Sequence, residues 1–453
     1  MTESKISPAF EQYLADGRPN DKRDAIVIYR TPSVGEEPRV RGRWRALKER
    51  LDEVQMRAAA HGPIQEKLAD SYKRAGAKHL AGDKQLQVAP IASNTLPVVT
   101  AQVTKRTLPE LAARPEVVAI LPNQKIHLIK PKEVNYERLG NAENKDKMTW
   151  GLKHLGIPEM WSKAKTKGKG INVAVLDTGV YGDHPALANQ LKDFIVMDPV
   201  GRRIKSTPAF DCGTHGTHVC GTIAGGKASG GISIGVAPEA NLFVAAVLVG
   251  DGVTVKTLLD GIAWAIESGA DIINMSLGFT YYEPLFVEVF KMLIEEYGVL
   301  PVVAIGNENH GNTSSPGNAH NAFSIGAIEK MPKSKVDVPF FSSGASLVFP
   351  GSPIALVTKP DVVAPGVQVY SCIPPEQTSD GTFEYSYMDG TSMATPHAAG
   401  VAALLMSAKP HAPVTEVIEA MKKTAKHPFG VDARPDNRWG YGMIQPLEAF
   451  HAL

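Results

Sequence analysis

Cysteine is scarce in this sequence, which contains Cys212, Cys220 and Cys372 and no others in 453 residues. An odd and sparse set does not build the disulfide framework typical of small secreted proteins, and it suits a reducing compartment. The first ten residues also lack the basic start and the apolar stretch of a secretory signal. We therefore expect a cytoplasmic protein, and a secreted protein is the alternative.

The chain also lacks an excess of one charge and any long apolar run. Lys and Arg total 48 and Asp and Glu total 47, which gives no support to binding of nucleic acid or of a membrane surface. No apolar run approaches the roughly 18 to 20 residues that cross a bilayer. A hydrophobic content of 43% and this length instead fit a globular protein of two domains.

The first third of the chain has the pattern of a small α+β domain. An apolar strand at residues 25–29 precedes a helical pattern that carries Trp44, Leu47, Leu51 and Val54 at spacings of three and four. We expect residues 61–63, His-Gly-Pro, to break or bend this helix. Further strands are expected at 86–90, 96–101, 117–121 and 125–129, with a short helix at 108–113.

The order β-α-β-β-α-β predicts a ferredoxin-like unit over residues 1–129. Residues 130–147 are rich in charge and Asn, and we interpret them as a linker. From residue 148 short buried strands alternate with helices, with strands expected at 171–176, 241–246, 272–275 and 300–305. This alternation predicts an α/β domain over 148–453, with a mainly parallel sheet covered by helices on both faces.

The active site of such a sheet lies beyond the carboxyl ends of its strands. Asp177 follows one predicted strand, and Asn307 follows another. Ser392 opens an apolar helix, where free backbone N–H groups and the positive end of the dipole face the reacting centre. Each feature alone has a simpler interpretation, as a polar turn or a capped helix. A phosphate loop is the chief rival at Ser392, but no Lys follows that serine.

His215 and His218 stand three residues apart at a predicted helix start. Such a pair could suggest a metal site. However, no Glu lies between them as in a zincin, and no third ligand is evident nearby. Amide hydrolysis by a serine needs a base and a carboxylate that orients it. His215 is the better base, and His218 is expected to be packed in the interior.

Four segments, in this order, resemble the signature segments of the subtilase family of serine peptidases. They are Val175-Leu-Asp-Thr-Gly179, His215-Gly-Thr-His-Val-Cys-Gly221, Ala304-Ile-Gly-Asn307 and Gly390-Thr-Ser-Met-Ala-Thr-Pro-His397. The order Asp, His, Asn, Ser distinguishes this family from chymotrypsin-like and α/β-hydrolase enzymes. The resemblance spans about residues 148–453 and implies a serine endopeptidase.

The resemblance implies a role for each of four residues. Asp177 would orient His215, and His215 would act as general base and then as general acid. Ser392 would form the acyl-enzyme, and Asn307 with the Ser392 amide would form the oxyanion hole.

The same resemblance implies where substrate binds. Ser276, Leu277 and Gly278 would form one wall of the primary specificity pocket and an edge that pairs with extended protein or peptide substrates. Glu308 would lie at the mouth of the pocket. Ser314 and Ser315 would lie near its base and leave room for an apolar or large side chain.

By its fold pattern, the unit over 1–129 resembles the inhibitory propeptide of secreted subtilases. Its last strand would lie in the cleft like a product, and the chain would cut itself between about Leu128 and Lys147. The enzyme would then be a self-inhibited zymogen whose own N-terminal domain is its partner. Two rivals remain, a silent peptide-binding protein and a permanent regulatory domain at residues 1–129.

The chain departs from the family pattern at the calcium site. Several members hold structural calcium through an acidic residue in a His-Pro-Asp segment, where this chain has His184-Pro-Ala186. The loop over 229–235 also offers few of the oxygen ligands that calcium needs. We therefore expect chemistry without a cofactor and place the tight calcium site in question. Cys212 and Cys220 flank the His215 segment, and we expect them to be buried and inert rather than reactive.

Overall fold

The computed structural model describes residues 5–30, 47–79, 88–90, 94–136, 140–187, 189–199, 202–250, 253–348 and 356–453. Trp44 and residues 86–87, which belong to predicted elements, lie outside the described residues. Among the residues described, no helix is both long enough and apolar enough to span a membrane.

The first unit is an antiparallel sheet of four strands with helices in the connections between them. The strands are β1 (Arg23–Tyr29), β2 (Val88–Pro90), β3 (Val98–Val103) and β4 (Val117–Pro122), in the order β2-β3-β1-β4. Helices α2 (Leu47–His79) and α3 (Thr107–Ala112) connect them, and a short α1 (Glu11–Asp16) precedes the first strand. This is the ferredoxin-like arrangement that the sequence predicts.

The two faces of this sheet are buried in different ways. Alternate residues of a strand point to opposite faces, so Val27 and Tyr29 pack with Leu68 of α2. Ile26 and Ile28 belong instead to a hydrophobic cluster shared with helices of the second unit. One face of the small sheet therefore packs directly on the larger unit.

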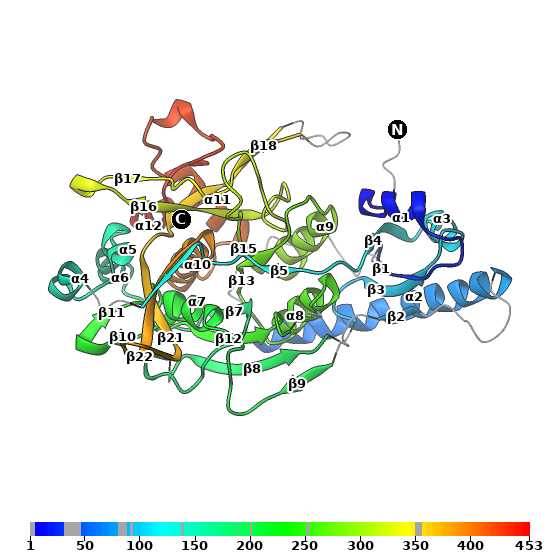
Figure 1. Cartoon of the computed structure of the whole chain (residues 1–453), viewed down its shortest axis with the longest axis horizontal. Helices are drawn as coiled ribbons and strands as arrows, with labels where there is room; N and C mark the ends of the chain where they lie inside the picture. Colours follow the sequence, from blue (N-terminus) through cyan, green and yellow to red (C-terminus); the bar gives the residue numbers. More distant parts are fainter. Residues whose placement is uncertain are drawn as a thin grey trace.

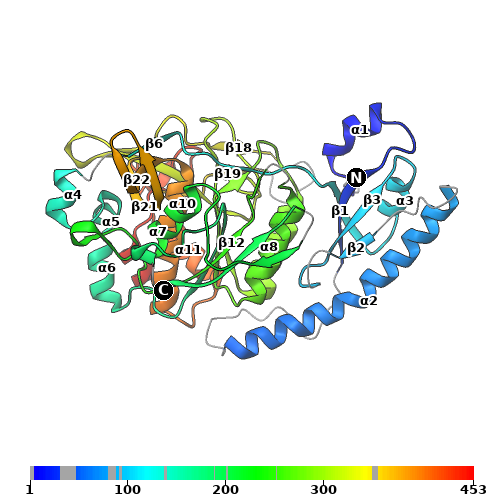
Figure 2. The ribbon, with the colours of Figure 1, turned by 60° about the horizontal axis from the view of Figure 1, so that its bottom comes forward.

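Helix α2 continues without interruption through Pro63, so of the predicted break or bend, the break is wrong. A proline inside a helix removes one backbone hydrogen bond and clashes with the preceding turn. Packing on both sides of the proline compensates, because Val54 and Leu68 are both buried. His61 Nδ1 also hydrogen-bonds to Asn94 O at 2.7 Å. Figure 2 shows α2 as one long helix from beside α8 to the far side of the small sheet.

The second unit is built on a nine-stranded sheet. Its order is β17-β16-β15-β13-β7-β12-β8-β9, with β20 beside β16, and all pairs are parallel except those of β9 and β17. The strands are β7 (Asn172–Asp177), β8 (Leu191–Met197), β9 (Arg203–Lys205), β12 (Asn241–Ala246), β13 (Ile272–Met275), β15 (Leu300–Ala304), β16 (Phe323–Lys330), β17 (Val336–Asp337) and β20 (Val362–Pro365).

Helices cover both faces of this sheet, as predicted. Val173 and Val175 of β7 pack in the cluster that contains α7 (His215–Ala224) and α10 (Thr391–Ala408). Ala174 and Leu176 pack in the cluster that contains α8 (Val255–Glu267) and α9 (Leu285–Lys291). Further helices of this unit are α5 (Trp150–His154), α6 (Ile157–Ala164), α11 (Val414–Thr424) and α12 (Pro446–Ala452).

An extended segment after β4 joins the two units and crosses the larger one (Figure 1). It contains β5 (His127–Leu128), which pairs with β14 (Leu277–Gly278), and β6 (Glu133–Asn135), which pairs with β22 (Gly381–Asp389). Strand β22 forms a hairpin with β21 (Val369–Thr378). Helix α4 (Asn141–Asp146) follows, so the stretch predicted as a linker contains a strand and a helix.

Candidate active site

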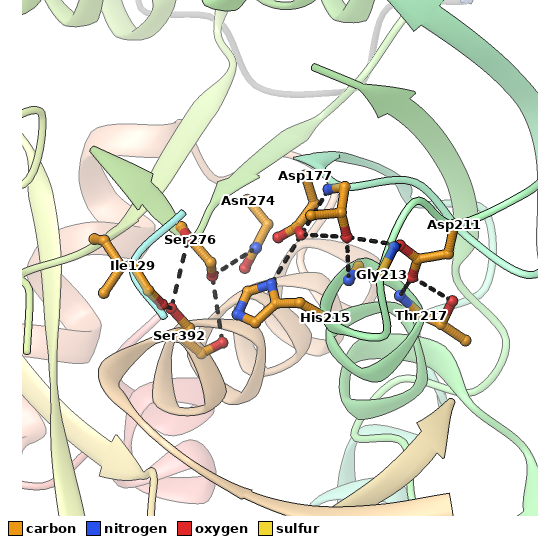
Figure 3. Close-up of polar contacts among 11 residues, drawn as sticks. Ile129, Asp177, Asp211, Gly213, His215, Thr217, Asn274, Ser276 and Ser392 are labelled. Atoms are coloured by element: carbon orange, nitrogen blue, oxygen red, sulfur yellow. Dashed lines mark hydrogen bonds and ion pairs between the residues drawn. The ribbon is translucent and has the colours of Figure 1, made fainter. Parts of the chain in front are cut away.

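Asp177 is the last residue of β7, a central strand of the sheet. Its carboxylate is fully buried, and Oδ1 accepts hydrogen bonds from Thr178 N at 2.7 Å and His215 Nδ1 at 2.8 Å. The parallel strand ends there, so the carboxylate projects from the carboxyl edge of the sheet. The structure therefore brings the predicted carboxylate and the predicted base into contact (Figure 3).

His215 is the first residue of α7 and is 3% exposed. With Nδ1 on Asp177, its Nε2 has no hydrogen-bond partner among the described residues. His218 lies one turn further, and its Nε2 contacts Val369 O at 3.0 Å and Ser386 O at 3.2 Å. Burial lowers the pKa of His218 to about 3, so this ring is neutral and packed, as predicted.

The paired histidines also raised the alternative of a metal site. Within the part of the chain that the structure describes, no group of three or more His, Cys, Asp or Glu side chains could hold a metal ion. His218 uses its ring nitrogen on backbone carbonyls, and His215 uses its own on a carboxylate. The geometry thus favours a base that is oriented by an acid.

Ser392 is the second residue of α10, where backbone N–H groups lack partners within the helix. Its hydroxyl donates to Ile129 O at 2.8 Å. Asn307 follows β15, and its Nδ2 donates to Lys130 O at 2.9 Å. The Oδ1 atom of Asn307 accepts from Thr391 N and Thr391 Oγ1, both at 2.9 Å, so the amide group is held in a fixed orientation.

The segment over residues 126–132 lies along this site as an added strand. Leu128 is opposite Leu277 and His127 is opposite Gly278, and Ile129 N donates to Ser276 O at 3.4 Å. Beyond the serine, Lys132 N donates to Asp389 O at 2.7 Å, and β6 continues on the edge of β22. The predicted edge at residues 276–278 therefore pairs with a segment of the same chain.

Close packing of two backbones requires a glycine at position 278 of this edge. A Cβ atom on Gly278 would lie 2.0 Å from Ser315 O, so only glycine allows the two backbones to approach. Ser315 Oγ accepts from Glu283 N at 2.9 Å and donates to Asn318 Oδ1 at 2.7 Å. Ser314 and Ser315 are buried beside this wall, and Glu308 is exposed. The width of the specificity pocket stays a prediction.

Sequence patterns did not identify two acidic residues near the site. Asp211 accepts hydrogen bonds from Thr178, the residue after Asp177, and from Thr217, in the first turn of the helix that begins with His215. Glu283 is 1% exposed, and burial raises its pKa to about 7. Of the two, only Asp211 could have been noticed in the sequence, because it lies four residues before His215 at the end of a polar loop.

The cysteines differ from one another. Cys220 and Cys372 are buried, and burial raises the pKa of both thiols, that of Cys372 to about 12. Cys212 is exposed, so the prediction that it is buried is wrong. It lies in the loop before α7, where partial burial and the charge of Asp211 raise its pKa. All three thiols are therefore weak nucleophiles at neutral pH.

Comparisons with known proteins agree with this arrangement. Residues 168–442 match the family model described as "Subtilase family". The chain is 37% identical to the "Major intracellular serine protease" of Bacillus subtilis (strain 168) over 267 residues, covering 57% of this chain and 74% of that protein. It is 34% identical to Subtilisin E of the same organism over 284 residues, covering 61% of this chain and 66% of that protein.

Among solved structures, the chain is similar to fervidolysin from Fervidobacterium pennivorans, described as a keratinolytic enzyme related to subtilisin. The TM-score is 0.67 at 25% sequence identity, and the match covers 96% of this chain. This chain spans 62% of the length of that structure. The match extends over both units of the fold.

Proposed function

This chain belongs to the subtilase family of serine peptidases, and we propose that it is an endopeptidase with Ser392 as nucleophile, made in a self-inhibited form. The observation that supports this most is the position of one strand of its own chain. Successive carbonyls of that strand contact Ser392 and Asn307, beside the hydrogen-bonded pair of Asp177 and His215.

In the proposed reaction Ser392 Oγ attacks the carbonyl carbon of an extended peptide, and His215 Nε2 takes the hydroxyl proton. Asp177 orients the ring and stabilises the imidazolium that forms. Asn307 Nδ2 and the Ser392 N–H donate to the oxyanion. His215 then protonates the leaving amine, and water hydrolyses the acyl-enzyme by the reverse proton path.

The chemistry as proposed needs no cofactor, because every proton transfer has a residue that performs it. Protein or peptide substrates would bind as added strands on residues 276–278, which favours unfolded or loop segments over folded ones. The relative named an intracellular protease is consistent with a cytoplasmic location, and that location stays a prediction.

Self-inhibition is supported by how the strand occupies the catalytic groups. The Ser392 hydroxyl donates to Ile129 O, while the oxyanion donor Asn307 is taken by the next carbonyl, Lys130 O. The attacking group and this donor are therefore divided between two carbonyls. A productive complex needs both on the same carbonyl, so this strand blocks the site and is cut slowly.

We place the self-cleavage at the bond between Ile129 and Lys130. The pairing of Leu128 with Leu277, and the hydrogen bond from Ile129 N to Ser276 O, bring the Ile129 carbonyl to Ser392. This bond lies within the range of 128–147 that the sequence predicts. The mature enzyme would then begin at Lys130.

A serine-directed fluorophosphonate tests the nucleophile. Matured wild-type enzyme should be labelled and Ser392→Ala should not, and a Ser407→Ala control, on a serine at the far end of α10, should be labelled like wild type. Equal labelling of Ser392→Ala would contradict the assignment and favour a silent binding protein.

Mass spectrometry of the purified full chain tests the zymogen. Wild type is expected to yield two fragments with a cut after Ile129, and Ser392→Ala should remain a single species. A wild-type chain that hydrolyses peptides while remaining intact would instead make the N-terminal unit a permanent regulatory domain.

A further inference from the structure

A second carboxylate, Asp211, lies beside the first turn of α7, next to Gly213 and Thr217 (Figure 3), and it links that turn to the end of the strand that carries Asp177. Its Oδ1 accepts from Thr178 Oγ1 at 2.7 Å and from Gly213 N at 3.0 Å. Its Oδ2 accepts from Thr217 N at 2.8 Å and from Thr217 Oγ1 at 2.6 Å. Asp211 therefore bonds both to the residue after Asp177 and to the first turn of α7, where His215 lies.

The first turn of α7 depends on these outside partners. The residue before the helix, Thr214, makes no capping bond with its side chain. The backbone N–H groups of Gly216 and Thr217 would be left without partners inside the helix. Gly216 N donates to Thr178 Oγ1 at 3.0 Å, and Thr217 N donates to Asp211. Asp211 thus caps the helix, and its negative charge interacts favourably with the positive end of the helix dipole.

The loop after β7 is tied to the same turn. Thr217 Oγ1 accepts from Tyr181 N at 2.9 Å, and Cys212 N donates to Thr178 O at 3.1 Å. A Cβ atom on Gly216 would lie 2.1 Å from Gly179 O, so the loop and the helix are in close backbone contact. The position of His215 relative to Asp177 is therefore set by a network with Asp211 at its centre.

The hydroxyl of Thr178 has two carboxylates within reach and one proton to give. Its Oγ1 lies 2.7 Å from Asp211 Oδ1 and 3.2 Å from Asp177 Oδ1. The shorter contact assigns the proton to Asp211. Without that acceptor, the hydroxyl would turn to Asp177 Oδ1, the same oxygen that accepts from His215 Nδ1. An added donor there would weaken the stabilisation of the imidazolium.

We propose that Asp211 is a positioning residue of the catalytic reaction, which holds the His215 helix against the Asp177 strand end and draws the hydroxyl proton of Thr178 away from Asp177 Oδ1. This inference rests on the proposed function. It assigns Asp211 no contact with substrate.

The test is steady-state peptide hydrolysis by matured Asp211→Asn, with active sites titrated by fluorophosphonate. An amide replaces an acceptor with a donor, so one of the bonds to Thr178 or Thr217 is lost. We expect kcat per titrated site to fall about 10- to 100-fold with KM little changed, since small displacements of catalytic groups have effects of this size. The acid limb of the kcat/KM pH profile should move to lower pH, because the Thr178 hydroxyl would then donate to Asp177 Oδ1 and weaken the stabilisation of the imidazolium.

Asp436→Asn is the matched control. Asp436 also accepts several hydrogen bonds at a turn, from Arg438 N at 2.9 Å, Trp439 N at 2.6 Å and His427 Nε2 at 3.1 Å, and none of these partners belongs to the proposed machinery. It should keep the wild-type kcat per titrated site and the wild-type pH profile. A merely structural role for Asp211 would lower the titrated fraction and leave both readouts unchanged, which would overturn the inference.

Thr178→Val and Thr178→Ser keep the test decisive if Asp211→Asn does not fold. The valine variant removes the hydroxyl that contacts Asp211 and should lower kcat per titrated site, while the serine variant should restore most of it. A wild-type kcat in Thr178→Val would count against the proposal. If wild type itself is neither labelled nor active, the proposed function fails, and that result is distinct from a failure of the inference.

Discussion

At the scale of single residues, the sequence pattern predicted that Asp177 lies at the end of a strand and that His215 and Ser392 lie at helix starts, as the structure shows. Their proposed catalytic roles came from the resemblance to the subtilase family, because each feature alone also fits a polar turn or a capped helix. Asp211 could not be predicted in this way. Its importance depends on hydrogen bonds to Thr178 and Thr217, and a loop carboxylate carries no periodic signal.

Asn307 provides a test of the oxyanion hole. Asn307→Ala removes the Nδ2 donor that contacts Lys130 O, and it should lower kcat by about 10²- to 10³-fold with a small change in KM. Steady-state kinetics of the matured enzyme on a peptide substrate measure both values. A loss that appears in KM alone would mean that Asn307 binds substrate without stabilising the transition state.

The buried carboxyl group of Glu283 should make the stability of the protein depend on pH. Burial raises its pKa from 4.5 to about 7, so between these values the unfolded chain releases the proton while the folded protein retains it. The free energy of unfolding should therefore fall as pH rises from 4.5 to 7, by up to about 3 kcal/mol. In the Ser392→Ala background, urea unfolding of Glu283→Gln should lack this decrease.

The exposed Glu416 offers a matched control, since Glu416→Gln leaves the buried carboxyl in place. Its unfolding free energy should follow that of the Ser392→Ala protein across the same pH range. If the Glu283→Gln curve retains the full decrease between pH 4.5 and 7, another group is responsible.

At the scale of elements, helix α2 shows what sequence patterns left out. The pattern identified the helix and predicted a break or bend at residues 61–63, and no break occurs because the packing on either side, of which local propensity takes no account, holds the helix together. The pattern also did not show that the helix reaches the second unit. Arg50 of α2 bonds to Asp271 Oδ1 at 2.6 Å and to Ala270 O at 3.1 Å.

This contact predicts a second attachment of the N-terminal unit, separate from the strand in the active site. The Asp271 side chain is 2% exposed. Arg50→Ala would therefore remove the guanidinium partner of a buried carboxylate, which would keep its hydrogen bond from Asn172 N. We expect the substitution to weaken the binding free energy of the N-terminal unit by about 2 kcal/mol, at the low end of the range for the loss of one partner of a buried charge pair. After self-cleavage, inhibition by the released unit should weaken about 30-fold.

The change in inhibition is obtained by measuring the peptidase activity of the processed enzyme with its own N-terminal fragment over a series of dilutions. Arg106→Ala, on an exposed arginine of the same unit, is the control and should inhibit like wild type. Equal inhibition by all three proteins would show that α2 contributes nothing to the attachment.

The pattern predicted a strand at 125–129, which contains β5, but only the family resemblance implied its pairing with the edge at β14. Strand β6 and its pairing with β22 were not predicted, because a strand of three residues has too few positions to show alternation and its partner lies more than a hundred residues away. For the same reason residues 130–147 were interpreted as a linker. Only the resemblance to the family pointed to a strand in the cleft.

At the scale of the whole molecule, the class of both units was predictable, because strands and helices alternate regularly along each. The way they pack was not predictable. The cluster that joins them mixes Ile26 and Ile28 of the small sheet with residues of α8 and α9, and nothing in the pattern of β1 distinguishes that face from the other.

Metal removal is a test at this scale. His184 lies in the segment where the sequence departs from the expected calcium-binding pattern, and its ring contacts Ala186 N at 3.0 Å and Glu384 O at 3.1 Å. We expect EDTA to leave both the Tm and the peptidase rate of the matured enzyme unchanged, as thermal unfolding with and without added calcium would show. A Tm that falls with EDTA and returns with calcium would contradict this expectation.

The strand between β14 and β22 is covalently tethered to the site that it fills. A short tether holds its segment at an effective concentration in the millimolar range, so substrates at micromolar levels cannot compete with it. One cut turns an intramolecular equilibrium into a bimolecular one, in which dilution alone separates the partners. Inhibition of the precursor would therefore not depend on the protein concentration, whereas inhibition of the processed enzyme would weaken as the protein is diluted.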